Sequence, residues 1–144
     1  MKCYTYIDQE HEEEVLIYSH EKTKLVEDIE NIVNSSSIEI KGIYNDEIVI
    51  INPIDVCCFL SEANKVYALI GDRKYQIKYR LYQLEEMKLN KSFIKINQSC
   101  YANIKRIKKF ESTISGALKV IFNNGYVDYI ARRELKNVKE RMGL

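Results

Sequence analysis

The chain has 144 residues, of which 46% are hydrophobic and 30% are charged, and its net charge is +1. This length suits one domain with a hydrophobic core, and the composition is too apolar for a disordered chain. No apolar run approaches the ~20 residues of a membrane-spanning helix, and the N-terminus does not resemble a signal peptide, so we expect a cytoplasmic protein.

The near-neutral total hides two parts of opposite charge. Residues 1–64 contain 4 Lys and Arg against 14 Asp and Glu, whereas residues 65–144 contain 18 against 7. A strongly basic C-terminal part indicates contact with a polyanion. The alternative is that the two parts face and neutralise each other within the fold.

The hydrophobic pattern predicts a mostly β protein of about ten strands with short helices. Alternating apolar and polar residues, or short apolar runs between turn residues, are typical of strands. The predicted strands are residues 1–8, 14–19, 38–43, 47–51, 56–60, 65–70, 74–79, 93–97, 107–114, 117–122 and 126–131. The long C-terminal part has no alternating βα pattern, which excludes a doubly wound sheet and favours an antiparallel meander.

Three helices and two single helical turns are predicted between these strands. Apolar residues at helical spacing predict helices at residues 22–34, about 80–88 and 132–142. Single turns are expected after Asn52-Pro53 and near Ile104. The run Ser35-Ser36-Ser37 is the one linker-like stretch, so we divide the chain into a β-β-α extension, residues 1–36, and a main domain, residues 37–144.

Residue types that would support catalysis or metal binding are poorly placed. Both histidines, His11 and His20, lie in the acidic N-terminal part, which leaves no Ser-His-Asp or Cys-His arrangement in the main domain. The four cysteines lack Cys-x-x-Cys spacing and read as free thiols, and the five glycines are isolated. We therefore expect no enzymatic activity, no metal and no cofactor.

Three loop tips place amide or guanidinium groups beside basic residues. They are Asn64-Lys65 in a predicted hairpin, Asn97-Gln98-Ser99 at a polar elbow and Arg132-Arg133 at the start of the last predicted helix. Asn and Gln can bond adenine with two hydrogen bonds, and Arg can bond guanine in the same way, while Lys attracts phosphates. No pair of adjacent helices suits a helix-turn-helix, so bases would have to be read from turns on a β scaffold.

Four stretches of the chain resemble the LytTR DNA-binding domain family. The sequence FIKINQSCYANIKRIKKF (93–110) looks like the family signature, and ALKVIFNNGYVDYIARRELKNVKERM (117–142) looks like its final hairpin and helix. Upstream, VCCFLSEANKVYALI (56–70) and YQIKYRLYQLEEM (75–87) resemble its first hairpin and short helix. The resemblance covers roughly residues 40–142. It implies an elongated antiparallel β fold, and residues 1–36 resemble the extension of stand-alone regulators without a receiver domain.

The resemblance also implies roles for single residues. It places base reading, in successive major grooves, at Asn64, Gln98 and Arg132. Contacts that hold the protein on the phosphates are expected at Lys65, Lys78, Lys95, Asn97, Ser99, Arg106 and Arg133, and Asn103 is expected to be structural. The family commonly has a basic residue in place of Gln98 and a Ser in place of Ala131, and losing that N-cap should cost ~1 kcal/mol of helix stability.

These observations favour a sequence-specific regulator that binds double-stranded DNA as a homodimer. A second hypothesis is a protein-interaction module whose acidic N-terminal part docks a partner; the resemblance suggests a small membrane protein. A third is binding of single-stranded nucleic acid through tyrosines that alternate along the predicted strands. These tyrosines are Tyr4, Tyr6, Tyr67, Tyr75 and Tyr79.

Overall fold

The computed structural model describes residues 1–36, 38–87, 89 and 92–144, and contains ten strands and three α-helices. The strands are β1 (Ile40–Tyr44), β2 (Glu47–Ile51), β3 (Cys58–Glu62), β4 (Lys65–Ile70), β5 (Arg73–Ile77), β6 (Phe93–Asn97), β7 (Cys100–Asn103), β8 (Ile107–Ser112), β9 (Leu118–Phe122) and β10 (Val127–Ile130). The helices are α1 (Lys24–Ser36), α2 (Leu81–Glu86) and α3 (Arg132–Met142), and two short 3-10 helices are η1 (Pro53–Asp55) and η2 (Ile104–Arg106).

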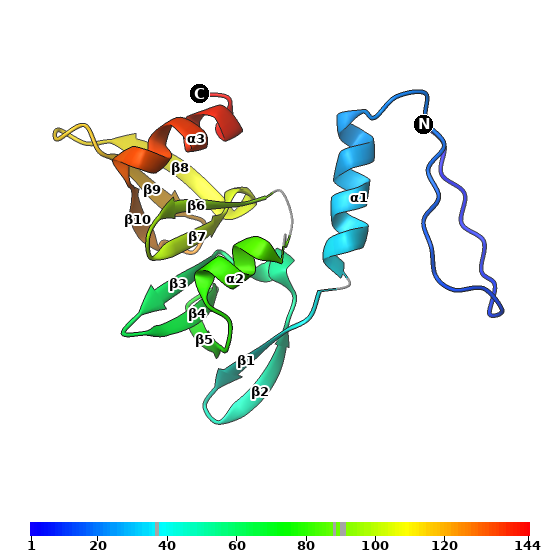
Figure 1. Ribbon diagram of the computed structural model, residues 1–144, viewed down its shortest axis with the longest axis horizontal. Helices are drawn as coiled ribbons and strands as arrows, with labels where there is room; N and C mark the ends of the chain where they lie inside the picture. Colours follow the sequence, from blue (N-terminus) through cyan, green and yellow to red (C-terminus); the bar gives the residue numbers. More distant parts are fainter. Residues whose placement is uncertain (37, 88, 90–91) are drawn as a thin grey trace.

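The strands form two antiparallel sheets. The larger sheet has seven strands in the order β2-β1-β5-β4-β3-β7-β6, and the smaller has three in the order β10-β9-β8 (Figure 1). Every pairing of these strands is antiparallel. This mostly β architecture of about ten strands confirms the predicted fold class.

The central strands β3 and β7 of the larger sheet are covered on both faces, and because successive residues of a strand point to opposite faces, their side chains enter two different cores. In β3, Cys58 and Leu60 belong to a core shared with β9, β10 and α3, whereas Phe59 belongs to a second core with α2 and the β1-β2 hairpin. Phe59, Phe93 and Tyr101 pack their rings together in this second core, with centroids 5.4–6.4 Å apart. The sheet is thus a rigid plate from which the turns project.

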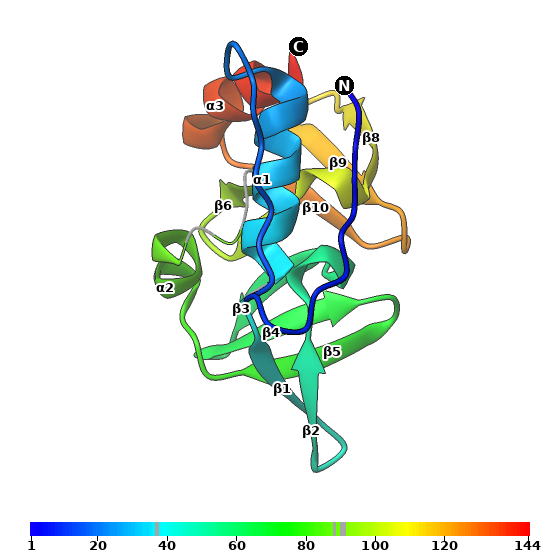
Figure 2. The ribbon, with the colours of Figure 1, turned by 90° about the vertical axis from the view of Figure 1, so that its right-hand side faces the viewer.

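The N-terminal segment differs from its prediction. Residues 1–23 contain no strand, so the strands predicted at 1–8 and 14–19 are wrong, whereas the predicted helix is present as α1. Nearly all side chains of residues 1–23 are exposed. Two lone strands without a buried face are marginal in water. The two extended runs lie on the far side of α1 from the sheets (Figures 1 and 2).

Strand β7 is the one strand of the sheets that the sequence pattern does not predict. Its four residues are all buried, because it lies between β3 and β6 with a core on each face. Such a strand shows no alternation of apolar and polar residues, and its sequence, Cys-Tyr-Ala-Asn, is short and only weakly apolar. The elbow at residues 97–99 is therefore a hairpin turn between β6 and β7.

We expect Gly42→Ala to lower the free energy of unfolding by about 1–3 kcal/mol, because Gly42 lies where two strands leave no room for a side chain. A Cβ atom there would lie 2.9 Å from the Cβ of Tyr75 and would also overlap Cδ1 of the buried Ile51. Urea unfolding followed by circular dichroism measures the loss. The neighbouring variant Lys41→Ala changes an exposed residue of the same strand and should stay within about 0.5 kcal/mol of wild type. Equal stability of the two variants would contradict the expected crowding.

Candidate nucleic-acid interface

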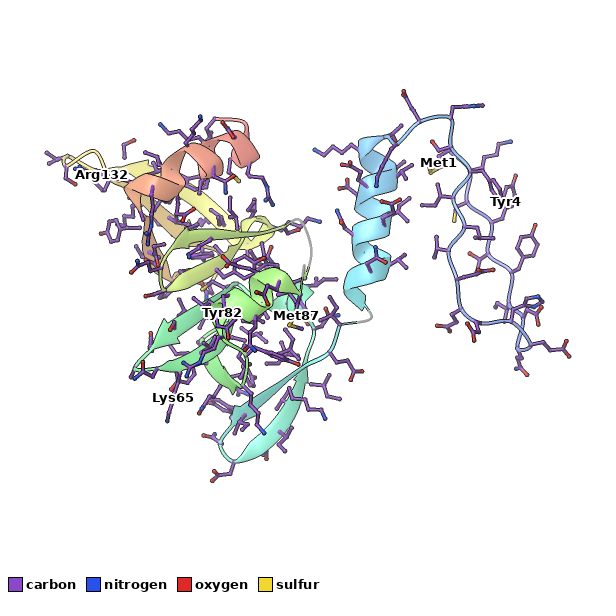
Figure 3. The ribbon with its side chains drawn as sticks, viewed as in Figure 1. Met1, Tyr4, Lys65, Tyr82, Met87 and Arg132 are labelled. Carbon is purple, nitrogen blue, oxygen red and sulfur yellow. The ribbon has the colours of Figure 1, made fainter. Side chains whose placement is uncertain are left out.

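The three turns singled out in the sequence meet at one edge of the molecule. The Ser61 amide donates a hydrogen bond to the Ser99 carbonyl at 2.9 Å, which joins the β3-β4 turn to the β6-β7 turn. The Ala131 amide donates to the Ile96 carbonyl at 2.8 Å, which brings in the start of α3. Lys65 and Arg132 accordingly lie on the same, left-hand side of Figure 3. We call this surface the three-turn edge; its residues are Asn64, Lys65, Gln98, Ser99, Arg132 and Arg133.

Asn64 stands at the tip of the two-residue turn between β3 and β4. Ala63 and Asn64 have φ angles of 48° and 64°, as a tight hairpin turn requires, and Asn accepts this left-handed conformation well. The Asn64 side chain is exposed, while its carbonyl accepts a hydrogen bond from Nη1 of Arg80 at 2.8 Å. Arg80 therefore ties the turn to the start of α2.

Arg80 lies beside the three-turn edge and was missed by sequence reasoning. The sequence did contain a signal for the position of Arg80. A short turn joins β4 to β5, so these two strands must be antiparallel. Val66 pairs with Ile77, so the residues after β5 return beside Lys65. The run Lys78-Tyr79-Arg80 thus adds two exposed cations next to the three-turn edge.

Gln98 and Ser99 are exposed at the tip of the β6-β7 turn, and Asn97 holds this turn in place. Nδ2 of Asn97 donates to Oδ1 of Asp128 and to the Tyr129 carbonyl, both at 2.9 Å. Oδ1 of Asn97 accepts the Ser99 amide at 2.8 Å. Both Nδ2 and Oδ1 of Asn97 therefore have partners within the protein, and these bonds hold the β6-β7 turn in place. The phosphate contact expected for Asn97 stays a prediction.

Asp128 accepts the hydrogen bond from Nδ2 of Asn97 and also accepts one from a neighbouring hydroxyl. The hydroxyl of Tyr126 donates to Oδ2 of Asp128 at 3.2 Å. Burial, reinforced by this carboxylate, raises the pKa of Tyr126 far above its usual value, so the hydroxyl remains a donor at any physiological pH. The bonds made by Asp128 thus orient the side chain that supports the β6-β7 turn.

Helix α3 begins with two exposed arginines at the three-turn edge. Ala131 occupies the N-cap position and makes no side-chain cap bond, which agrees with the missing Ser noted in the sequence. Arg132 and Arg133 are exposed, and no ion pair is recorded for either within the described part of the chain. Cations at a helix N-terminus oppose the helix dipole. An anion bound there would relieve this repulsion.

Arg106 lies at the opposite end of the sheets and is not retained in this surface. Its Nε and Nη2 donate to the Ile54 carbonyl at 3.2 and 2.9 Å, and Nη2 lies 3.7 Å from Oδ1 of Asp55. β7 runs from the three-turn edge to η2, and four residues of strand span ~13 Å. Arg106 therefore does not belong to the same surface as the three-turn edge.

Asn103 is buried and lies at that same opposite end. Its Nδ2 donates to the Val56 carbonyl at 3.0 Å, its Oδ1 accepts the Lys105 amide at 3.1 Å, and its own amide donates to the Cys57 carbonyl at 2.9 Å. The side chain caps η2 and connects it to the loop before β3. The structural role that the family resemblance implies for Asn103 stays a prediction, and these buried contacts are its physical basis.

Two other predicted phosphate contacts, Lys78 and Lys95, lie near the three-turn edge. Lys78 follows Ile77 at the end of β5 that lies beside Lys65, and its side chain is exposed. Lys95 is half-buried in the edge strand β6, opposite Tyr101 and three residues before Gln98. Together with Arg80, they surround the three turns with positive charge.

The described residues contain no group of three His, Cys, Asp or Glu side chains that could hold a metal ion. Cys3 is exposed and the thiols of Cys57, Cys58 and Cys100 are buried and free. None of the helices in the described ranges is long and apolar enough to cross a membrane.

Comparisons with known proteins show the family to which the chain belongs. The family model for the LytTr DNA-binding domain matches residues 46–143. An uncharacterized HTH-type transcriptional regulator of Staphylococcus aureus strain MSSA476 is 32% identical over 147 residues, with 100% of this chain and 99% of the relative covered. A similarly described regulator of strain NCTC 8325 is 32% identical over 126 residues, with 84% and 85% covered.

A solved structure shares the fold. It is the LytTr DNA-binding domain of a Bacillus cereus protein, with a TM-score of 0.68 and 17% sequence identity, and the match covers 74% of this chain and 97% of that one. Although the relatives are named HTH-type, strands separate the α-helices from one another in the described part of this chain, and no helix-turn-helix is formed there. On the family match and the fold together, the chain belongs to the LytTr DNA-binding domain family.

Proposed function

We propose that the chain is a transcriptional regulator that reads bases of double-stranded DNA with the three-turn edge. The observation that supports this most is the meeting of Asn64, Gln98 and Arg132 at one edge, from two hairpin turns and the start of α3, with all three side chains exposed. Asn and Gln have the donor and acceptor pair that matches adenine, and Arg has the paired donors that match guanine. Separate turns on a rigid plate can enter successive major grooves along one face of a duplex.

The cations around the turns would hold the protein on the sugar-phosphate backbone. We assign this role to Lys65, Lys78, Lys95 and Arg133, and a neutral phosphate contact to Ser99. Such contacts carry no sequence information, but they supply much of the affinity and make it sensitive to salt. Arg80 joins this group through its position beside Asn64.

Selection of bound fragments from genomic DNA is the experiment that tests the function. The purified chain should enrich a small set of fragments that share a motif, and it should bind one of them at least tenfold more tightly than a scrambled duplex of equal length. Equal binding of specific and scrambled duplexes at physiological salt would argue against sequence-specific regulation.

We expect Lys95→Ala to weaken binding to specific and scrambled duplexes by the same factor and to flatten the salt dependence. Removal of one phosphate contact should reduce the slope of log K against log salt by about 0.9. Fluorescence anisotropy at several salt concentrations measures both effects. The matched control is Lys108→Ala, which removes an exposed lysine near η2; it should leave the slope unchanged. A loss confined to the specific duplex would reassign Lys95 to base reading.

We also propose that the active form is a cytoplasmic homodimer without enzymatic activity, and that residues 1–36 dock a partner. Leu25, Ile32 and Val33 of α1 are exposed in the single chain, which supports a docking role for this segment. A small membrane protein is the partner class that the family resemblance suggests. No relative's name supports the interaction module as the main function.

The burial and packing of the strand tyrosines give little support to the hypothesis that the chain binds single-stranded nucleic acid. Tyr67, Tyr75 and Tyr79 are half-buried, and Tyr75 packs against the Tyr44 ring with centroids 5.3 Å apart. Rings engaged in this way are not free to stack on bases. Competition between single-stranded and double-stranded oligonucleotides of one sequence should favour the double strand.

A further inference from the structure

Three isoleucines form an exposed apolar patch on the β1-β2 hairpin. Ile43, Ile48 and Ile50 are 41%, 74% and 63% exposed. Ile43 pairs with Ile48, and Ile50 pairs with Lys41, so these side chains lie on the same outer face of the hairpin. The inner face carries buried residues such as Ile51 and needs no further cover. A group of neighbouring exposed apolar side chains indicates an interaction site, whereas apolar residues exposed singly are normal on a soluble protein.

The patch lies on an unprotected sheet edge. β2 is the outermost strand of the seven-stranded sheet, and its partner among the described strands is β1 alone. Proteins usually guard such an edge with Pro, Lys or a bulge, but β2 has the sequence Glu-Ile-Val-Ile-Ile and pairs with β1 in unbroken register. The hairpin projects away from α3, at the lower end of Figures 1 and 2.

The turn of the hairpin determines which backbone groups of β2 are free. Asn45 and Asp46 have φ angles of 49° and 63°, as in a two-residue turn, so Tyr44 and Glu47 form the hydrogen-bonded pair next to it. Hydrogen-bonded and non-hydrogen-bonded pairs alternate along an antiparallel ladder. Ile48 and Ile50 therefore direct their amide and carbonyl groups away from β1, toward the open edge.

We propose that β2 pairs antiparallel with β2 of a second copy across a two-fold axis at Val49. In this register Ile48 lies opposite Ile50 of the second copy, and the backbone groups of both residues find partners. Glu47 lies opposite the apolar Ile51 rather than opposite another Glu47, so the pairing brings no like charges together. The segment is thus complementary to itself, which is why we choose a second copy as its occupant.

This pairing brings Ile48 and Ile50 of each hairpin into side-by-side contact with their counterparts on the second copy, and it leaves the DNA surface open. In the sheet order, β1 and β5 lie between β2 and β4. β4 begins directly after the β3-β4 turn, so two strands separate the proposed contact from that turn. The proposal supplies a surface for the homodimer proposed above, but it does not depend on the base contacts. Five residues on each side form a smaller contact than the ~800 Å² per partner of a standard interface, so we expect a weak dimer.

Light scattering on the full chain over a range of concentrations tests the association. Wild type should shift from monomer to dimer as the concentration rises, and Ile48→Lys should weaken this shift at least tenfold. The matched control is Ile114→Lys on the β8-β9 turn, which also replaces a fully exposed isoleucine and should dimerise as wild type does. A wild type that stays monomeric, or equal behaviour of the two variants, would overturn the proposal. If Leu25→Lys in α1 removed the dimer and Ile48→Lys did not, the interface would be the N-terminal segment instead.

A cysteine at the two-fold axis tests the register. Val49 and its copy would form a non-hydrogen-bonded pair with Cα atoms ~4.5 Å apart, a separation that allows a disulfide. Val49→Cys in a background with the exposed Cys3 changed to Ser should therefore cross-link under mild oxidation. Lys41→Cys in the same background should not, because β1 lies one strand further from the axis. Equal cross-linking of the two variants would exclude this register, whatever the DNA-binding result.

Discussion

Arg132→Ala is expected to remove most of the preference for a target duplex over a scrambled one. Arg132 is exposed at the start of α3, and the Ala131-Ile96 hydrogen bond fixes where that start lies on the three-turn edge. A bidentate contact between Arg and guanine contributes ~1–3 kcal/mol of discrimination, which is roughly 5-fold to 150-fold in relative affinity. Mobility shifts or anisotropy on a selected target and its scrambled version measure the ratio.

Arg133→Ala is the matched control for this change. It removes the same charge from the next residue of the same helix, so it should weaken both duplexes by a similar factor and leave their ratio near the wild-type value. Since both variants take a cation from the helix N-terminus, neither should destabilise α3. If Arg132→Ala and Arg133→Ala lowered specific and scrambled binding equally, Arg132 would be a phosphate contact and the base-reading assignment would be wrong.

Asn103→Ala is expected to lower the free energy of unfolding by about 3 kcal/mol without changing base preference. The substitution leaves the buried Val56 carbonyl without its Nδ2 partner, at ~1–3 kcal/mol, and removes the cap of η2, at ~1 kcal/mol. Urea unfolding measures the stability. DNA binding at a temperature where the variant remains folded should retain the wild-type ratio of specific to scrambled affinity.

Asn124→Ala is the matched control for the loss of stability expected of Asn103→Ala. Nδ2 of Asn124 donates to the Gly71 carbonyl at 2.6 Å, but the residue is exposed, so water can replace the lost bond. The expected loss is about 0.5–1 kcal/mol. Similar destabilisation by the two Asn variants would show that burial of Asn103 is not what makes its hydrogen bonds valuable.

The sequence was most informative where one residue dictates a local backbone conformation. Asn64 indicates its turn because Asn accepts the left-handed conformation that the structure has there, with a φ angle of 64°. Gly125, with a φ angle of 88°, indicates the turn between β9 and β10 in the same way. Asn64 could thus be placed on a turn before its position relative to Gln98 and Arg132 was known.

The sequence was least informative where a residue's role depends on distant parts of the chain. β7 has no alternating pattern because it is covered on both faces. Residues 1–23 alternate, but none of the residues that the structure describes provides the buried face that strands would need. Asn97 and Arg106 have side chains suited to DNA, but Tyr129 and Ile54, respectively 32 and 52 residues away in sequence, use them as donors. Such pairings cannot be read from local pattern.

The hydrogen bonds of Asn97 have a consequence for the form of the target sequence. They join the larger sheet to the smaller one, so the separation between Gln98 and Arg132 is built into the protein rather than adjusted on binding. A duplex advances 3.4 Å and turns roughly 34° with each base pair. If Gln98 and Arg132 read bases as proposed, the two nucleotide clusters that they contact must keep a constant spacer, and a single inserted base pair would rotate one cluster out of reach.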